Sequence, residues 1–389
     1  MRLFWQEMQK IWRPGILAAL VVLGVLFYFL RPKFWIELIP KTQNFDNSLM
    51  LVERYGPVLT AEIRPELDAI YEEIKENFNL EVKKIPGAAE IGITDLESYW
   101  AVDRSGEIYE VNVELFAKLW RLSMPANDFR LITGKYDGRM DGTFGIRNSP
   151  HLASYAPQAQ TRIIELEERE LRTKAVSFMD HAVPWYTSDW GRYLVIWTVL
   201  SVTLLLSPTL VRDRIRRTIA MQWTSRRGRR AVRTQTAAAL ASALLLALIN
   251  LIVYFAILAQ QGSLPLWNCP IYCGDGGIPW FDWTYGQFIL MLIGMNFAFA
   301  LAAGGLAVFL SQFSTNYVPM LLKAIPVFLV VGLVIANWAL SDPFLIQKSH
   351  YRGADNPKGI ELVCVLLLLA VSLGSCVWMC SRQQQREAP

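Results

Sequence analysis

Residues 237–259 read AAALASALLLALINLIVYFAILA, an apolar run of 23 residues without a charged side chain. A helix needs roughly 20 such residues to cross a hydrocarbon core about 30 Å thick. Five further runs of comparable length and mainly apolar character lie at 14–30, 190–211, 287–310, 318–340 and 360–380. The sequence therefore predicts an α-helical polytopic membrane protein with six transmembrane helices.

Composition agrees with this fold class. The 389 residues are 53% hydrophobic and only 19% charged, whereas soluble domains average about 25% charged residues. Three histidines and five cysteines leave too few ligands for a zinc-rich or haem-rich protein. We expect no metal.

The N-terminal segment is predicted to remain in the mature protein. Residues 1–13 place apolar side chains on one helical face, which predicts an amphipathic helix in the cytoplasmic membrane interface. The apolar run 14–30 ends in aromatic residues and is followed by Arg31 and Pro32, whereas signal-peptide cleavage sites need small residues. A cleaved signal peptide is therefore not expected.

The distribution of charge predicts orientation. Residues 212–236 contain nine arginines and one acid, whereas residues 260–286 contain no basic residue and two acids. Basic loops stay on the cytoplasmic side. With six spans, the Arg-rich loop 212–236, the N-terminus and the tail 381–389 are expected to be cytoplasmic in the cell membrane, and the loops 260–286 and 341–359 are expected outside.

The long segment 31–189 then lies outside and is long enough to fold as a domain. Residues 33–186 contain 18 basic and 25 acidic side chains. Apolar residues at helical spacing predict helices over 65–78, 113–122 and 156–178, so the domain is expected to be mainly helical. Glycines and aspartates over 133–149 predict a loop.

Two cysteines fall in the outer loop 260–286. Cys269 and Cys273 would form a small disulfide in an oxidising compartment, would stay as thiols in a reducing one, or would be part of a metal pair. No histidine or further cysteine lies near them in the sequence, which disfavours the metal.

The sequence contains no motif of an enzyme that acts on nucleotides or esters. The Gly-x-x-x-x-Gly-Lys-Ser/Thr phosphate loop, the Gly-x-Ser-x-Gly elbow and the His-Glu-x-x-His helix are all absent. A catalytic interpretation would depend on Asp137, Asp141 or the acidic run 165–170. We interpret these carboxylates as a solvated loop and a solvated helix face, and expect no enzymatic activity.

The Arg-rich loop 212–236 is the most informative segment. Its charge is explained by a topology signal or by a lipid-phosphate patch, and nucleic acid is disfavoured because both ends of the loop are tethered to the membrane. A topology signal alone does not account for the apolar residues between the arginines, Ile215, Ile219, Met221 and Trp223. These indicate a short amphipathic helix that docks on a cytoplasmic partner.

Residues 213–235, DRIRRTIAMQWTSRRGRRAVRTQ, resemble the cytoplasmic loop of type-2 ATP-binding-cassette (ABC) transporter permeases. The matching positions are Asp213, Thr218, Thr224-Ser225, Gly228-Arg229 and Arg233. Asp213 stands where that family usually has glutamate, and Thr218 where glycine is common. An interfacial helix followed by six spans is also similar to the family, whereas a large outer segment after span one occurs in only a subset of it.

The resemblance implies a permease subunit, an exporter rather than an importer, that carries no cofactor of its own. It implies cytoplasmic ABC ATPase subunits that bind ATP, a second permease copy or a homologous permease, and contact with membrane lipids. The residues implied to couple to the ATPase are Asp213, Arg214, Arg216, Arg217, Thr218, Arg226, Arg227, Arg229 and Arg230.

Polar residues inside the predicted spans mark a translocation path or join helices by hydrogen bonds. They are Asn250, Asn296, Lys323 and Asn337. The spans contain no repeated carboxylate or arginine for a small ion, which favours a lipid-like or peptide-like substrate. The alternative function is a membrane sensor or regulatory protein whose extracytoplasmic domain binds a ligand.

Overall fold

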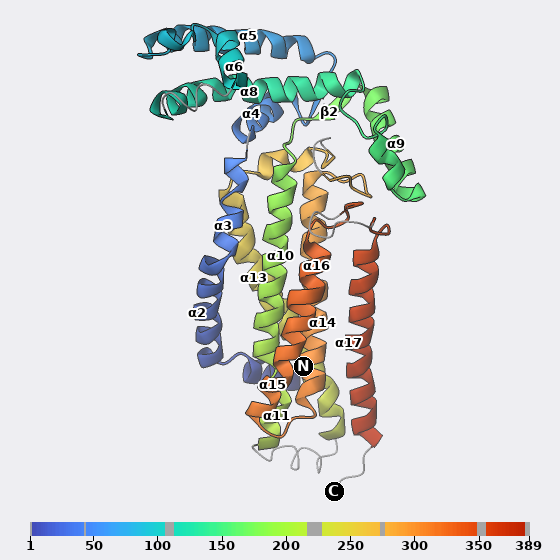
Figure 1. The fold of residues 1–389 in the computed structure, drawn as a ribbon. Coiled ribbons are helices and arrows are strands. Elements are labelled where there is room, and N and C mark those ends of the chain that lie inside the picture. The colour runs from blue at the N-terminus through green and yellow to red at the C-terminus, as the bar shows by residue number, and fades with distance from the viewer. Residues whose placement is uncertain are drawn as a thin grey trace. The chain divides into compact units, whose positions relative to one another are not determined.

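The computed structural model describes residues 2–42, 44–105, 113–215, 228–272, 277–347 and 355–385. The chain forms two compact units. The membrane unit comprises Met1–Lys41, Ala182–Trp267 and Gly277–Pro389, and the inserted unit comprises Thr42–His181 and Asn268–Gly276. Both units are built from helices (Figure 1), and the one sheet among the described residues has two strands.

The membrane unit contains the apolar helices. They are α1 (Arg2–Ile11), α2 (Pro14–Leu30), α3 (Pro32–Ile36), η1 (Ile39–Lys41), α10 (Ala182–Leu206), α11 (Thr209–Ile215), α13 (Gly228–Gln260), η5 (Leu264–Asn268), α14 (Tyr285–Ser311), α15 (Tyr317–Val327), the π-helix η6 (Phe328–Ala336), α16 (Asn337–Leu340) and α17 (Ile360–Gln385). Five of these helices or helix runs are long and apolar enough to cross a membrane, and the bent pair α1 and α2 raises the number to six. The chain is therefore an α-helical multi-pass membrane protein.

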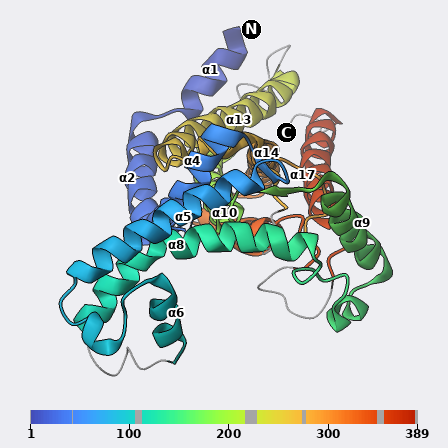
Figure 2. The same cartoon turned by 90° about the horizontal axis from the view of Figure 1, so that it is seen from above.

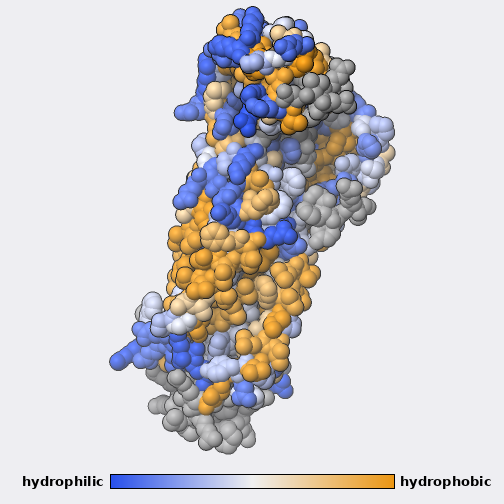
Figure 3. Space-filling view, turned by 60° about the vertical axis from the view of Figure 1, so that its left-hand side comes forward, coloured by the Kyte–Doolittle hydropathy of each residue, from blue (hydrophilic) through white to orange (hydrophobic). Residues whose placement is uncertain are grey.

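Helix α10 is the core of this unit. It is buried along most of its length and packs against α13, α14 and η6. The indole of Trp190, fully buried, donates a hydrogen bond of 2.8 Å to the carbonyl of Tyr254 on α13. By contrast, α2, α13 and α17 leave many apolar side chains exposed, Val22, Ile252 and Leu366 among them. Figure 3 shows how apolar residues cover one face of the unit, as expected for a lipid-facing surface.

Prolines and a glycine stand at several helix ends of the membrane unit. Helix α2 has the expected bounds because Pro14 starts it and Pro32 follows it. Helix α10 begins at Ala182, eight residues before the expected span, and ends at Leu206, where Pro208 follows and α11 begins. Helix α13 already begins at Gly228, so the last part of the segment 212–236 is helical.

The fifth span is one run of three helices. A π-helix of nine residues separates α15 from α16 and begins two residues after Pro326. Proline removes a backbone donor, and the wider turn of a π-helix accommodates the interrupted hydrogen bonding.

The C-terminal end of helix α1 packs against the rest of the membrane unit. It is bent by 51° from α2 and packs against α13, with Ile11 buried. The indole of Trp12, just beyond α1, donates to the hydroxyl of Ser242 on α13 at 3.1 Å.

The inserted unit has its own elements and cores. They are α4 (Phe45–Tyr55), β1 (Val58–Thr60), α5 (Arg64–Glu81), η2 (Val82–Lys84), η3 (Ala89–Ile91), α6 (Leu96–Ser105), α8 (Val113–Met140), η4 (Pro150–Ser154), α9 (Pro157–Thr173) and β2 (Ala175–Ser177). Helices α5 and α8 run side by side (Figure 2) and share two apolar clusters, one around Phe78 and Tyr99 and one around Leu67 and Phe129. Strands β1 and β2 pair antiparallel, with Leu59 opposite Val176.

Two expectations about this unit were wrong. The loop expected at 133–149 is helical as far as Met140, because Asp137 accepts two hydrogen bonds from Arg64 of α5 and because Gly138 lets the ring of Phe144 pack against the helix. The helix expected over 156–178 ends at Thr173, because Lys174 adopts a left-handed conformation with φ 49° and the chain continues as β2.

Candidate functional site

The predicted coupling residues lie at the ends of two helices and in the segment between them. Asp213 and Arg214 lie in α11, and Arg229 and Arg230 lie in the first turn of α13. Arg216, Arg217, Thr218, Arg226 and Arg227 lie outside the described residues. The role of this segment therefore stays a prediction.

Asn250 is the best-connected of the polar residues expected in the spans. Its side-chain oxygen accepts from the indole of Trp197 at 3.1 Å, and its amide donates to Thr198 and Ser201 at 3.3 and 3.0 Å. All three partners lie on α10. Asn250 thus joins α13 to α10, which is the helix-joining interpretation.

Asn296, Lys323 and Asn337 are not gathered at one place. The amide of Asn296, fully buried, donates to the carbonyl of Ala247 at 3.4 Å and so joins α14 to α13. The ammonium of Lys323 donates to the carbonyl of Phe313 at 2.8 Å, at the turn after α14. Asn337 is half-buried and starts α16. The translocation path stays a prediction.

Sequence reasoning missed a buried ion pair on α10. A carboxylate oxygen of Asp189 lies 2.5 Å from a guanidinium nitrogen of Arg192, and both side chains are buried. The two residues sit one turn apart, directly before the apolar run of α10. A sequence signal existed, because an Asp and an Arg three positions apart face each other on a helix.

The cysteine expectation is only partly within the described residues. Cys269 is buried, and Cys273 lies outside the described part of the chain. The disulfide stays a prediction. Among the residues that the structure describes, no group of three or more His, Cys, Asp or Glu side chains is placed to hold a metal ion.

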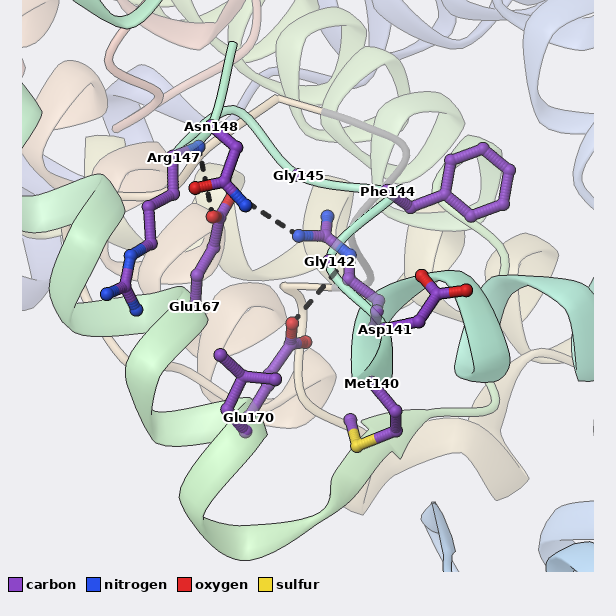
Figure 4. Close-up of a pocket in the computed structure, with 11 residues that line it drawn as sticks. Met140, Asp141, Gly142, Phe144, Gly145, Arg147, Asn148, Glu167 and Glu170 are labelled. Carbon is purple, nitrogen blue, oxygen red and sulfur yellow. Dashed lines mark hydrogen bonds and ion pairs between the residues drawn. The ribbon is translucent and has the colours of Figure 1, made fainter.

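The inserted unit contains a pocket of about 240 Å³ between the end of α8 and α9. We call it the Arg139 pocket; it is lined by Arg139, Met140, Asp141, Gly142, Phe144, Gly145, Arg147, Asn148, Glu167, Glu170 and Leu171. Figure 4 shows Glu167 and Glu170 on the same helix, both directed at the loop that follows α8.

Glu167 holds that loop in place. Its two carboxylate oxygens accept from the backbone N–H groups of Ile146 and Arg147 at 2.7 and 3.1 Å, and one of them lies 3.4 Å from Arg139. Gly145 makes this approach possible, because a Cβ there would lie 3.0 Å from a carboxylate oxygen of Glu167. The solvated-face interpretation was therefore wrong for Glu167 and Glu170, which are buried, while Glu165 and Glu168 are exposed.

Glu170 is the chemically unusual group of the Arg139 pocket. Burial raises the pKa of Glu170 to about 7, against the lowering effect of the charge of Arg139. One carboxylate oxygen lies 3.8 Å from the Arg139 Nε and accepts no hydrogen bond from any described residue. The guanidinium carbon of Arg139 lies 5.4 Å from the centre of the Tyr272 ring. Burial raises the pKa of the Tyr272 hydroxyl.

The arrangement can bind a small polar ligand. A buried carboxyl group with an unfilled oxygen accepts a hydrogen bond from a ligand, and the half-exposed guanidinium of Arg147 offers donors to an anionic group. The pocket's volume of about 240 Å³ equals that of roughly eight water molecules at about 30 Å³ each.

Comparisons with known proteins leave the chain without an assigned relative. No protein-family model, no curated protein and no solved structure matches it.

Proposed function

We propose that the chain is the permease subunit of an ABC transporter, an exporter that moves a substrate across the cell membrane with ATP hydrolysed by separate ATPase subunits. A chain without a phosphate loop must receive that free energy through contacts. A loop that docks differently in two nucleotide states is sufficient for this, because a ligand shifts an equilibrium by its differential affinity.

The observation that carries the proposal is the continuity between the Arg-rich segment and the spans. Helix α13 runs without interruption from Gly228 to Gln260. It therefore extends nine residues ahead of the span expected from Ala237, about 13 Å at the helical rise. On the other side, α11 follows α10 after Pro208. A displacement of the segment 216–227 would be passed to α11 and α13, both of which pack against α14.

The proposal includes a topology. Six spans are formed by α2, α10, α13, α14, the run α15 to α16, and α17. Both termini and the Arg-rich segment are cytoplasmic by the positive-inside rule, and the inserted unit is extracytoplasmic. Cytoplasmic ATPase subunits and a second permease copy complete the transporter.

The test is co-purification of the tagged full chain from the cells that encode it. We expect an ATP-binding-cassette ATPase to be retained by the wild type. The variant with Arg226, Arg227, Arg229 and Arg230 all changed to Ser should retain at least tenfold less ATPase, because arginine is one of the residues enriched among interface hot spots.

The matched control changes four exposed basic residues of the inserted unit, Arg54, Arg121, Arg172 and Lys174, to Ser. The control should keep the ATPase, and both variants should insert in the membrane to the same amount. Retention of no ATPase by the wild type would contradict the proposal, as would equal loss in the two variants.

The Arg139 pocket favours a second candidate function. A buried carboxyl with an unfilled acceptor oxygen in an inserted unit is what a ligand-binding sensor needs, and the Arg-rich segment would then signal to a different cytoplasmic partner. The two candidates differ in the ATPase: a sensor co-purifies without one, while a change in the pocket, Glu170→Gln, alters its signalling output.

A further inference from the structure

A second pocket of about 480 Å³ lies entirely within the membrane unit. We call it the Arg212 pocket. It is formed where α1 bends into α2, where α10 breaks into α11, and where α15 begins, and its lining includes Arg13, Gly15, Pro208, Arg212 and Tyr317. Three segments far apart in the sequence thus meet there.

Two prolines create the opening. Pro14 lies in the junction at which α1 and α2 are bent by 51°, and Pro208 separates α10 from α11. Gly15 of α2 borders open space, because a Cβ there would meet no atom within 4 Å apart from its chain neighbours and its own helix backbone. The helix breaks therefore leave room for a ligand group.

Arg212 is built into the pocket. Its side chain is 6% exposed, and one terminal nitrogen donates to the backbone carbonyl of Lys10 at the end of α1. Its Nε–H is buried and donates to no acceptor among the described residues. A buried guanidinium with an unsatisfied N–H is costly unless an anion compensates it.

The electrostatic potential in the Arg212 pocket is positive. Among the described residues, no acidic side chain lines the pocket. Arg13 contributes a second guanidinium. Helices α2 and α15 both begin at the pocket, and neither N-cap residue, Arg13 or Asn316, makes a side-chain capping hydrogen bond. Unpaired N–H groups and the positive end of the helix dipole at such termini attract anions.

The apolar part of the lining points to a lipid. Pro14, Ile16 and Pro208 line the pocket together with the arginines, and α2 continues from it with exposed Val21, Val22 and Val25. We propose that the Arg212 pocket binds the phosphate group of an anionic phospholipid, with Arg13 and Arg212 on the phosphate and the acyl chains along α2. The site needs no ATPase, so it stands apart from the proposed permease role.

The test is native mass spectrometry of the full chain released from detergent, with phosphatidylglycerol as the anionic probe and phosphatidylcholine as the zwitterionic one. We expect phosphatidylglycerol adducts to outnumber phosphatidylcholine adducts. Arg13→Gln should weaken phosphatidylglycerol binding about tenfold, the usual effect of losing one charge-assisted hydrogen bond. Gly15→Phe, which adds a ring to the lining of the pocket and keeps both arginines, should also weaken it.

Arg382→Gln is the matched control, because Arg382 is an exposed arginine in the last turn of α17 and does not line the pocket. It should bind phosphatidylglycerol as the wild type does. A thermal unfolding curve of each variant in detergent shows that it is folded. Equal binding by wild type, Arg13→Gln and Gly15→Phe would overturn the proposal, and so would binding of inorganic phosphate without binding of the lipid.

Discussion

Glu170 makes the inserted unit sensitive to pH in a direction that the structure determines. The folded protein raises the pKa of this carboxyl from its ordinary value of 4.5 to about 7. A group whose pKa is raised by folding binds more protons in the folded state, so its contribution to stability is complete below pH 4.5 and is lost as the pH rises towards 7. The perturbation is Glu170→Gln, which fixes the group in an uncharged form.

The magnitude follows from the size of the pKa change. A tenfold change in proton affinity corresponds to about 1.4 kcal/mol, so a rise from 4.5 to about 7 amounts to about 3 kcal/mol. At pH 8 the free energy of local opening at the end of α9 should therefore be about 2 to 3 kcal/mol higher in the variant than in the wild type. Its backbone amides should exchange roughly a hundredfold more slowly. At pH 5 the two proteins should be alike.

The assay is hydrogen exchange of the full chain followed by mass spectrometry, read on peptides from α9 at pH 5 to 8 after correction for intrinsic exchange. Glu165→Gln is the control, because Glu165 is an exposed carboxylate of the same helix. It should keep the pH dependence of the wild type. The reasoning is refuted if Glu170→Gln keeps that dependence too, or if the wild type loses no protection between pH 5 and pH 8.

Three further predictions concern other parts of the chain. Asn250→Leu removes three hydrogen bonds between α13 and α10 and should lower stability in detergent by about 1 to 2 kcal/mol, at roughly 0.6 each; an unchanged unfolding curve would exclude the helix-joining role. Gly305→Leu should destabilise by about 1 to 3 kcal/mol, because even a Cβ there would lie 2.2 Å from a serine hydroxyl of α17. Gly294→Ala, where a Cβ meets nothing within 4 Å, should be neutral in the same melts. Peptide mapping without reductant should show Cys269 linked to Cys273, and alkylation of both thiols in the native protein would rule the bridge out.

The spans could be predicted from the sequence because their signal is local. An apolar run is visible without knowledge of any partner, and Pro14 and Pro32 even gave the bounds of α2. The same local reasoning failed at Asp137. The glycines and aspartates around it predicted a loop. The helix continues instead, because Arg64, 73 positions away, binds the carboxylate of Asp137. Such a contact leaves no trace in the local pattern.

The candidate sites were harder to predict than the fold. Glu167 and Glu170 look like a solvated acidic run, because the sequence does not show that Arg139 of α8 pairs with both of them. Arg212 was counted among the nine arginines of one loop, and only the structure separates it from the others by its burial and its bond to the carbonyl of Lys10. Burial of a charge depends on distant segments, so a single sequence does not contain it.

Photo-crosslinking from Trp223 tests the central claim most directly. The residue lies in the middle of the Arg-rich segment, and a photoreactive amino acid in its place should form a covalent adduct with an ABC ATPase subunit. The same amino acid in place of Trp120, an exposed residue of the inserted unit, should form none. Absence of an ATPase adduct from position 223, or an equal adduct from position 120, would contradict the proposed coupling.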